Sequence, residues 1–193
     1  MHALPSNLSR GARIMIFIDG ENLAIRYGAM LKGREPPKHV SYERDIYVWS
    51  TRLQPTSHDV IRKYYYTSIT GDADRITEIE DKLKSLGIEA PRVFKKTKDR
   101  GAKQVDISLA TDMLTQAHRK NYDVAILVAG DQDYIPLIDA VMAEGARVVL
   151  WFVEDGLSDK LRSRADYYFD LGFLLLEFSS EELSRKLSYQ LWH

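Results

Sequence analysis

Four aspartates, Asp19, Asp106, Asp131 and Asp133, are the residues whose type and spacing suggest chemistry. Asp19 follows the apolar run "IMIFI", and Asp131 and Asp133 follow "VAILVAG". Asp106 opens the helical pattern "VDISLATDML", which precedes that second run. Carboxylates that converge raise each other's pKa unless a cation neutralises them. Because oxygen ligands favour hard cations, the pattern predicts a Mg²⁺ or Mn²⁺ site.

Such a site suits hydrolysis of a phosphodiester bond, in which a metal ion polarises the phosphoryl oxygen and orients the attacking water. Asn22 stands three residues after Asp19, in the opening turn of the next predicted helix. Its amide can face the same point as the Asp19 carboxylate. We therefore expect Asn22 to fix a water molecule or the phosphate.

Each acid also has an ordinary structural interpretation, because aspartate is a favoured helix N-cap and acids stabilise a helix's first turn. Asp133, directly before "YIPLIDAV", is the expected cap of that helix. Asp131 lies two residues earlier, so capping of that helix does not explain its carboxylate. We therefore expect Asp131 to act at the metal site. Asp112 lies roughly 120° around the helix from Asp106 and is the weaker candidate, expected either to be structural or to support a ligand residue without touching the ion.

Basic residues near the predicted acids are candidates for binding the substrate. The segment "RVFKKTKDRGAK" (92–103) carries six basic residues and one acid, and it includes Lys95, Lys96 and Lys103. Arg26, four residues after the asparagine, lies on the same predicted helical face. A solvated loop explains the segment taken alone. Beside an acidic pocket, the same charges favour contacts to a nucleic-acid backbone.

The composition describes one globular domain, or one domain with a small appendage, in 193 residues with 45% hydrophobic and 28% charged residues and a net charge of -1. The absence of cysteine excludes disulfides and thiolate metal sites. The apolar runs are too short to span a bilayer, and the N-terminus lacks the apolar middle of a signal peptide. We therefore expect a cytoplasmic protein with no membrane partner.

Strand-like runs alternate with helical patterns, which predicts an α/β fold with a parallel sheet flanked by helices. The predicted strands are 13–18, 63–68, 90–94, 124–129, 147–152 and 167–171. The predicted helices are 21–31, 41–50, 74–87, 105–120, 134–145 and 179–192. Ligands of such sheets bind beyond the carboxyl ends of the strands, near the point where strand order reverses. All four aspartates should lie at that edge. Tyr64, Tyr65, Tyr66 and Tyr134 can stack on bases, but tyrosines in a strand more often pack the sheet.

Three parts are expected along the chain: an N-terminal arm (1–12), a domain (13–178) and a C-terminal helix (179–193). Leu183, Leu187 and Leu191 form one stripe of that last helix. The stripe either docks on the protein's own core or forms a homodimer contact, and the sequence leaves both open.

The pieces "FIDGENL", "KQVDISLATDML", "LVAGDQDYIPLI" and "GARVVLWF" together resemble the NYN domain family, in its LabA-like branch of the PIN-like nuclease superfamily. The resemblance implies a Rossmann-like sheet, one or two Mg²⁺ or Mn²⁺ ions and endoribonuclease activity. By motif it makes Asp19, Asp106 and Asp131 the metal ligands, with Asp133 beside them and Asn22 as polar partner. Two positions depart from the family pattern: Ala129 replaces a common serine, and Gln104 replaces a common glycine.

The resulting expectation is a metal-dependent ribonuclease, endonucleolytic on single-stranded or loop RNA, because a duplex would enter an acidic crevice poorly. One alternative is a regulatory RNA-binding or protein-interaction module with a structural Mg²⁺ ion. Another is a phosphatase of the haloacid dehalogenase type. Glu21 stands where that chemistry needs a second aspartate as general acid, so it would be a poor substitute.

Overall fold

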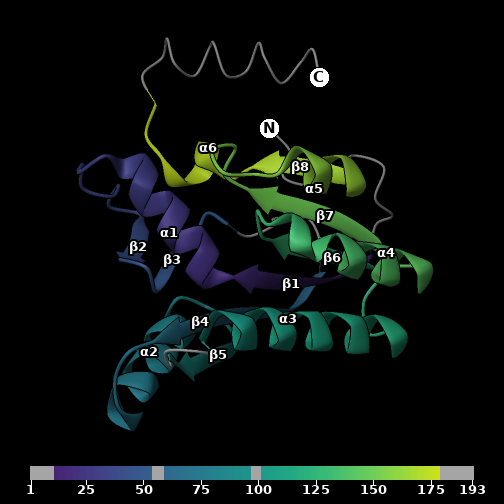
Figure 1. The fold of residues 1–193 in the computed structure, drawn as a ribbon, viewed down its shortest axis with the longest axis horizontal. Coiled ribbons are helices and arrows are strands. Elements are labelled where there is room, and N and C mark those ends of the chain that lie inside the picture. The colour runs from purple at the N-terminus through teal and green to yellow at the C-terminus, as the bar shows by residue number, and fades with distance from the viewer. Residues whose placement is uncertain (1–10, 54–58, 97–100, 179–193) are drawn as a thin grey trace.

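The computed structural model describes residues 11–53, 59–96 and 101–178. Its main sheet has six parallel strands in the order β5-β4-β1-β6-β7-β8 (Figure 1). The strands are β1 (Arg13–Asp19), β4 (Asp59–Ile69), β5 (Ala90–Lys95), β6 (Val124–Val128), β7 (Arg147–Phe152) and β8 (Tyr167–Asp170). The predicted α/β fold with a parallel sheet is therefore confirmed. Most of the predicted arm, the middle of the basic segment (97–100) and the C-terminal helix with its homodimer contact lie outside the described residues.

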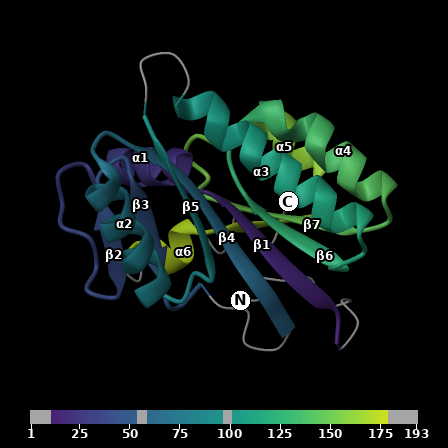
Figure 2. The same ribbon diagram turned by 90° about the horizontal axis from the view of Figure 1, so that it is seen from below.

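Helices cover both faces of the sheet (Figure 2). On one face lie α1 (Gly20–Leu31), α2 (Ala73–Ser85) and α6 (Gly172–Leu175), and on the other lie α3 (Gly101–His118), α4 (Ile135–Ala143) and α5 (Asp159–Arg164). Alternate side chains of a strand point to opposite faces. Accordingly Ile14, Ile16 and Ile18 pack under α1, whereas Met15 and Phe17 pack under α3. Within the described residues, no helix has the length and apolar character needed to cross a bilayer.

The helix predicted at 41–50 is wrong, because this segment forms the antiparallel hairpin of β2 (Val40–Glu43) and β3 (Tyr47–Ser50). Asp45 in the connecting turn has φ 59°, a left-handed conformation that a helix interior excludes. The buried residues Val48 and Trp49 are β-branched and aromatic, types that favour strands. The mixture of aromatic and charged residues hid this strand pattern.

The strand tyrosines Tyr64, Tyr65 and Tyr66 pack the sheet, because each is at most 2% exposed. Tyr64 stacks on Phe17 with 5.2 Å between the ring centroids. These rings are consequently closed to bases, and the packing interpretation is confirmed for them.

Strand order reverses between β1 and β6, since the chain builds outward to β5 on one side and to β8 on the other. This reversal marks the crevice where ligands of open parallel sheets bind. Glycines follow both strands where the backbone passes close to aromatic rings. A Cβ on Gly20 would lie 1.8 Å from the Tyr65 ring, and one on Gly130 would lie 2.2 Å from Phe152. The chain therefore leaves β1 and β6 at the switch point through positions that tolerate no side chain.

Candidate active site

Asp19 ends β1 and caps α1. Its Oδ1 accepts a hydrogen bond from the Asn22 backbone N–H (3.1 Å), which fixes the carboxylate at the switch point. The side chain is 4% exposed. Burial raises the pKa of Asp19 to about 7, and the charge of Asp106 adds to this effect, against the hydrogen bonds from Asn22 and Tyr134. Asp19 is therefore an acid whose ionised form is costly when no cation is near.

Tyr134 joins two of the predicted acids. Its hydroxyl lies 3.0 Å from Asp19 Oδ2 and 3.0 Å from Asp106 Oδ1. Burial, together with the two carboxylates, raises the pKa of Tyr134 far above its ordinary value, so the phenol stays protonated. A phenol has only one proton to donate. Two ionised carboxylates therefore leave one of these contacts without a hydrogen, and a proton on Asp19 or a cation is needed to satisfy it.

Tyr134 was missed as a site residue. Its ring is buried, so it is unavailable for base stacking. Tyr134 ends η1 (Gln132–Tyr134), and its hydroxyl reaches Asp106 of α3 through a contact between residues that are 28 positions apart. No spacing rule in the sequence indicates this contact.

Asp131, and not Asp133, is the cap after β6. The Asp131 Oδ1 accepts a hydrogen bond from the Asp133 N–H (3.1 Å) and caps η1, whereas α4 begins without a side-chain cap. The predicted capping roles are therefore wrong. The cause is an extra 3₁₀ turn before α4, whose first turn carries Pro136 in place of a donor that needs a cap. Among the described residues, none donates a hydrogen bond to the Asp133 carboxylate.

Asp106 faces both of these exposed acids from α3. Burial raises its pKa, the hydrogen bond from Tyr134 lowers it, and the charges of Asp131, Asp133 and Glu21 raise it again. The helix begins at Gly101, four residues before the predicted start, so Asp106 stands in its second turn and not in its first. We call Asp19, Asp106, Asp131 and Asp133 the acid cluster.

Asn22 contributes an unsatisfied oxygen beside this cluster. Its Oδ1 and Trp49 Nε1 are the two buried side-chain polar atoms of the described residues that have no hydrogen-bond partner. Asn22 lines a polar pocket of about 340 Å³ together with Arg26, Gly130 and Asp131. Buried polar groups are normally paired, so an unpaired oxygen here fits a bound water or cation.

The donor set fits Mg²⁺ or Mn²⁺ in chemistry, since every candidate ligand is an oxygen. Within the described part of the chain, however, no three carboxylate or imidazole groups converge as a ready metal site. The predicted triad of Asp19, Asp106 and Asp131 is therefore not assembled as three direct ligands. An ion that keeps several waters and takes one or two carboxylates remains compatible with this geometry.

The predicted cationic residues differ in whether their charged groups are already paired with an acid. Lys96 Nζ donates to Glu21 Oε1 (2.5 Å), and Glu21 Oε2 accepts from Ser68 Oγ (2.5 Å). Both oxygens of the buried Glu21 side chain are therefore hydrogen-bonded, and Glu21 anchors Lys96 at the edge of the sheet. The sequence alone indicates only an ordinary acid in the first turn of a helix. Lys95 is exposed at the end of β5.

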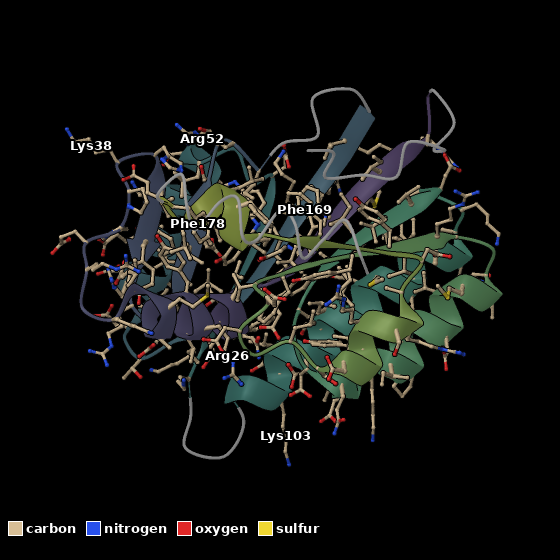
Figure 3. The ribbon with its side chains drawn as sticks, turned by 90° about the horizontal axis from the view of Figure 1, so that it is seen from above. Arg26, Lys38, Arg52, Lys103, Phe169 and Phe178 are labelled. Carbon is tan, nitrogen blue, oxygen red and sulfur yellow. The ribbon has the colours of Figure 1, made fainter. Side chains whose placement is uncertain are left out.

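Arg26 and Lys103 are also exposed and lie along the same side of the molecule (Figure 3). Arg26 comes from α1 and lines the polar pocket, while Lys103 comes from the first turn of α3. Asp112 is structural as expected: it accepts a hydrogen bond from Tyr66 Oη (2.8 Å) and lies 3.7 Å from Arg92.

A parallel sheet flanked by helices, with acids gathered at its switch point, is the architecture of the PIN-like nuclease fold. The chain matches the sequence profile of the NYN domain over residues 13–176 and belongs to the NYN domain family. A curated relative is the "Low amplitude and bright protein LabA" of Synechococcus elongatus. The two are 24% identical over 172 residues, which cover 84% of this chain and 85% of the relative.

A solved structure supports the fold. It is the crystal structure of a protein of unknown function from Vibrio parahaemolyticus, which superposes with a TM-score of 0.62 at 19% sequence identity. The match covers 90% of this chain and 100% of that one. At this identity the likeness establishes the fold alone.

Proposed function

We propose that the protein is a metal-dependent ribonuclease that cleaves single-stranded or loop RNA endonucleolytically. The observation that carries the proposal is the shared hydroxyl between Asp19 and Asp106, with Asp131 and Asp133 beside them, at the switch point of the sheet. Two of the four acids share one tyrosine proton, and the other two lie nearby, so the fully ionised site favours a cation. Membership of the NYN family supports the same activity.

In this proposal Asp19, Asp106 and Asp131 would hold a Mg²⁺ or Mn²⁺ ion, a type of ion that keeps several waters and needs only one or two direct carboxylates. When bound, the ion supplies neutralising charge and polarises the phosphoryl oxygen. Asp133, whose carboxylate has no hydrogen-bond donor among the described residues, positions the attacking water or a second ion. Asn22 positions water or phosphate with its side-chain amide.

The substrate's backbone is held by the exposed cations Arg26, Lys95 and Lys103. Lys96 contributes less, because its ammonium group is already paired with Glu21. The scissile phosphate must reach a partly buried acid cluster at the end of the sheet. A single strand can bend to do so more readily than a duplex, which supports the preference for unpaired RNA.

The test uses a labelled RNA that contains a hairpin and single-stranded flanks, with Mn²⁺, with Mg²⁺ and with EDTA. Asp131→Asn keeps the size and the capping ability of the side chain but removes its charge. Asp74→Asn, at an exposed first-turn aspartate of α2, is the matched control. We expect metal-dependent cleavage of the unpaired flanks that falls at least about a hundredfold in Asp131→Asn and is unchanged in the control.

Equal cleavage by wild type and Asp131→Asn refutes the assignment of the acids. Metal-dependent RNA binding without any cleavage favours the alternative of a binding module with a structural Mg²⁺ ion. The phosphatase alternative has no support in the geometry, because both oxygens of Glu21, its required general acid, are engaged by Ser68 and Lys96.

A further inference from the structure

An apolar groove runs from the acid cluster between α3 and α4, which pack side by side (Figure 2). Its volume is about 450 Å³. Three acids of the cluster line one end of it, and Tyr134 is also part of its lining. The two helical walls are formed by Ile107, Ala110 and Leu114 of α3 and by Pro136, Leu137 and Ala140 of α4. We call this feature the α3–α4 groove.

The groove exposes large apolar side chains that a helix surface normally buries. Ile107 is 65% exposed and Leu114 is 37% exposed. Asp106 and Leu114 are eight positions apart, so the wall extends along about 12 Å of helix. This length exceeds that of one nucleobase. Of the four large apolar side chains that are exposed among the described residues, Ile107 and Leu114 therefore line a groove that a substrate held at the acids would enter.

We propose that the α3–α4 groove binds the nucleobase next to the scissile phosphate, an inference that rests on the proposed ribonuclease function. The argument is continuity: Asp106, Asp131 and Asp133 belong both to the groove and to the acid cluster. A ligand that fits this arrangement has a flat apolar part that lies in the groove. A few bonds away it has a second, anionic part that reaches a cation held at the carboxylates. A nucleotide has this chemistry.

The walls suit a base, because flipped or unpaired bases bind between apolar as well as aromatic side chains. The polar pocket with Asn22 and Arg26 adjoins the groove at Asp131, because that aspartate lines both spaces. A strand that crosses the cluster can thus place a base in the apolar space and a neighbouring phosphate near Arg26. The two spaces differ in chemistry in the same way as the two parts of a nucleotide.

The experiment measures kcat/KM with Mn²⁺ on a short single-stranded RNA whose cleaved bond has been mapped, and on the same strand with one abasic ribose at each position in turn. Ile107→Ala removes an exposed wall of the groove without opening the core. Ile25→Ala, at another exposed isoleucine (44%) on α1, is the matched control. A second pair is Ala140→Leu, which fills the groove, and Ala143→Leu, at an exposed alanine of α4 outside its lining.

We expect one abasic position, beside the cleaved bond, to lower kcat/KM about tenfold, the effect of losing one base contact. Ile107→Ala and Ala140→Leu should each lower kcat/KM by a similar factor on the intact strand. On the strand that lacks this base, the same substitutions should lower kcat/KM little further, because the substitution and the loss of the base remove the same contact. The two controls should match wild type.

The inference is overturned if Ile107→Ala and Ala140→Leu cleave as well as their controls. That result would leave the groove to another occupant, such as an apolar peptide, while the ribonuclease function stands. It is also overturned if the losses from Ile107→Ala and from the abasic position multiply independently. Absence of cleavage by the wild-type protein on every strand is a distinct result, because it removes the proposed function together with this inference.

Discussion

Replacing Asp19 by asparagine in the metal-free protein should stabilise it at neutral pH. The substitution removes the charge and keeps the shape. The new Oδ1 can still accept the N–H of Asn22, and the new amide N–H can donate to the Tyr134 hydroxyl. That hydroxyl then keeps its proton for Asp106. Asparagine therefore reproduces the hydrogen bonds of a protonated Asp19.

The expected size follows from the pKa of Asp19, which burial raises from 3.8 to about 7. The folded state binds this proton more tightly than the unfolded chain does. Below the pKa that Asp19 has in the unfolded chain, the side chain does not lower the free energy of unfolding. As the pH rises above that pKa the free energy of unfolding falls, and it stops falling above about pH 7. At about 1.4 kcal/mol per pKa unit, the loss is on the order of 4 kcal/mol. For a chain of this size, that corresponds to roughly 8–16 °C in Tm.

The assay is thermal unfolding of wild type and Asp19→Asn in EDTA, from about pH 5 to about pH 8.5. The two Tm values should approach each other at the acidic end, and the variant should become the more stable protein as the pH rises. Titration of other groups changes both proteins and largely cancels in the difference. A variant that is less stable at pH 8, or a difference that does not change with pH, would refute the account of Asp19 as a buried acid held protonated near neutrality.

Three further outcomes are expected. Mn²⁺ should raise the Tm of wild type more at pH 8 than at pH 6, because protons compete with the ion for the ligands. It should raise the Tm of Asp19→Asn far less. Equal increases in Tm for the two proteins would place the ion elsewhere. Tyr134→Phe should lower the unfolding free energy of the metal-free protein by about 1–3 kcal/mol, since two carboxylates lose their shared donor, and the deficit should shrink when Mn²⁺ is added. Burial raises the pKa of Glu89, but hydrogen bonds from Lys63 outweigh it and leave that pKa below its ordinary value. Glu89→Gln should therefore lower Tm at pH 7, because Lys63 is buried, and the difference should vanish as the pH falls through the lowered pKa; a difference that persists in acid would contradict this.

The sheet and the position of the acids at its edge were predictable because they follow from local patterns. Apolar runs alternate with helical periods, and the carboxyl ends of parallel strands share one edge. Asp19 and Asp131 therefore had to lie at the same edge once their runs were recognised as strands, and the pairing of β1 with β6 makes them neighbours. The hairpin at 41–50 was not predictable in this way, because its turn depends on a left-handed Asp45 that the sequence pattern does not mark.

The contacts within the site depend on packing between elements, which no spacing rule contains. The Tyr134 hydroxyl meets Asp106 across 28 residues and Asp19 across 115. Glu21 is engaged by Ser68 and Lys96, which are supplied by the ends of two other strands. Sequence reasoning could place residues at the same edge but could not decide which oxygen meets which donor.

A capping role and the catalytic role proposed for Asp19 and Asp131 are compatible at this site. Asp19 and Asp131 each use Oδ1 to accept a backbone N–H at the start of a helix. A carboxylate has a second oxygen, and the cap fixes the direction in which that oxygen points. At Asp19 the second oxygen meets the Tyr134 hydroxyl, so the cap orients the side chain toward the other acids. Capping is then a means of preorganising the carboxylates. Asparagine at either position preserves the cap and removes the charge, so substitutions to asparagine separate the two roles, whereas substitutions to alanine remove both.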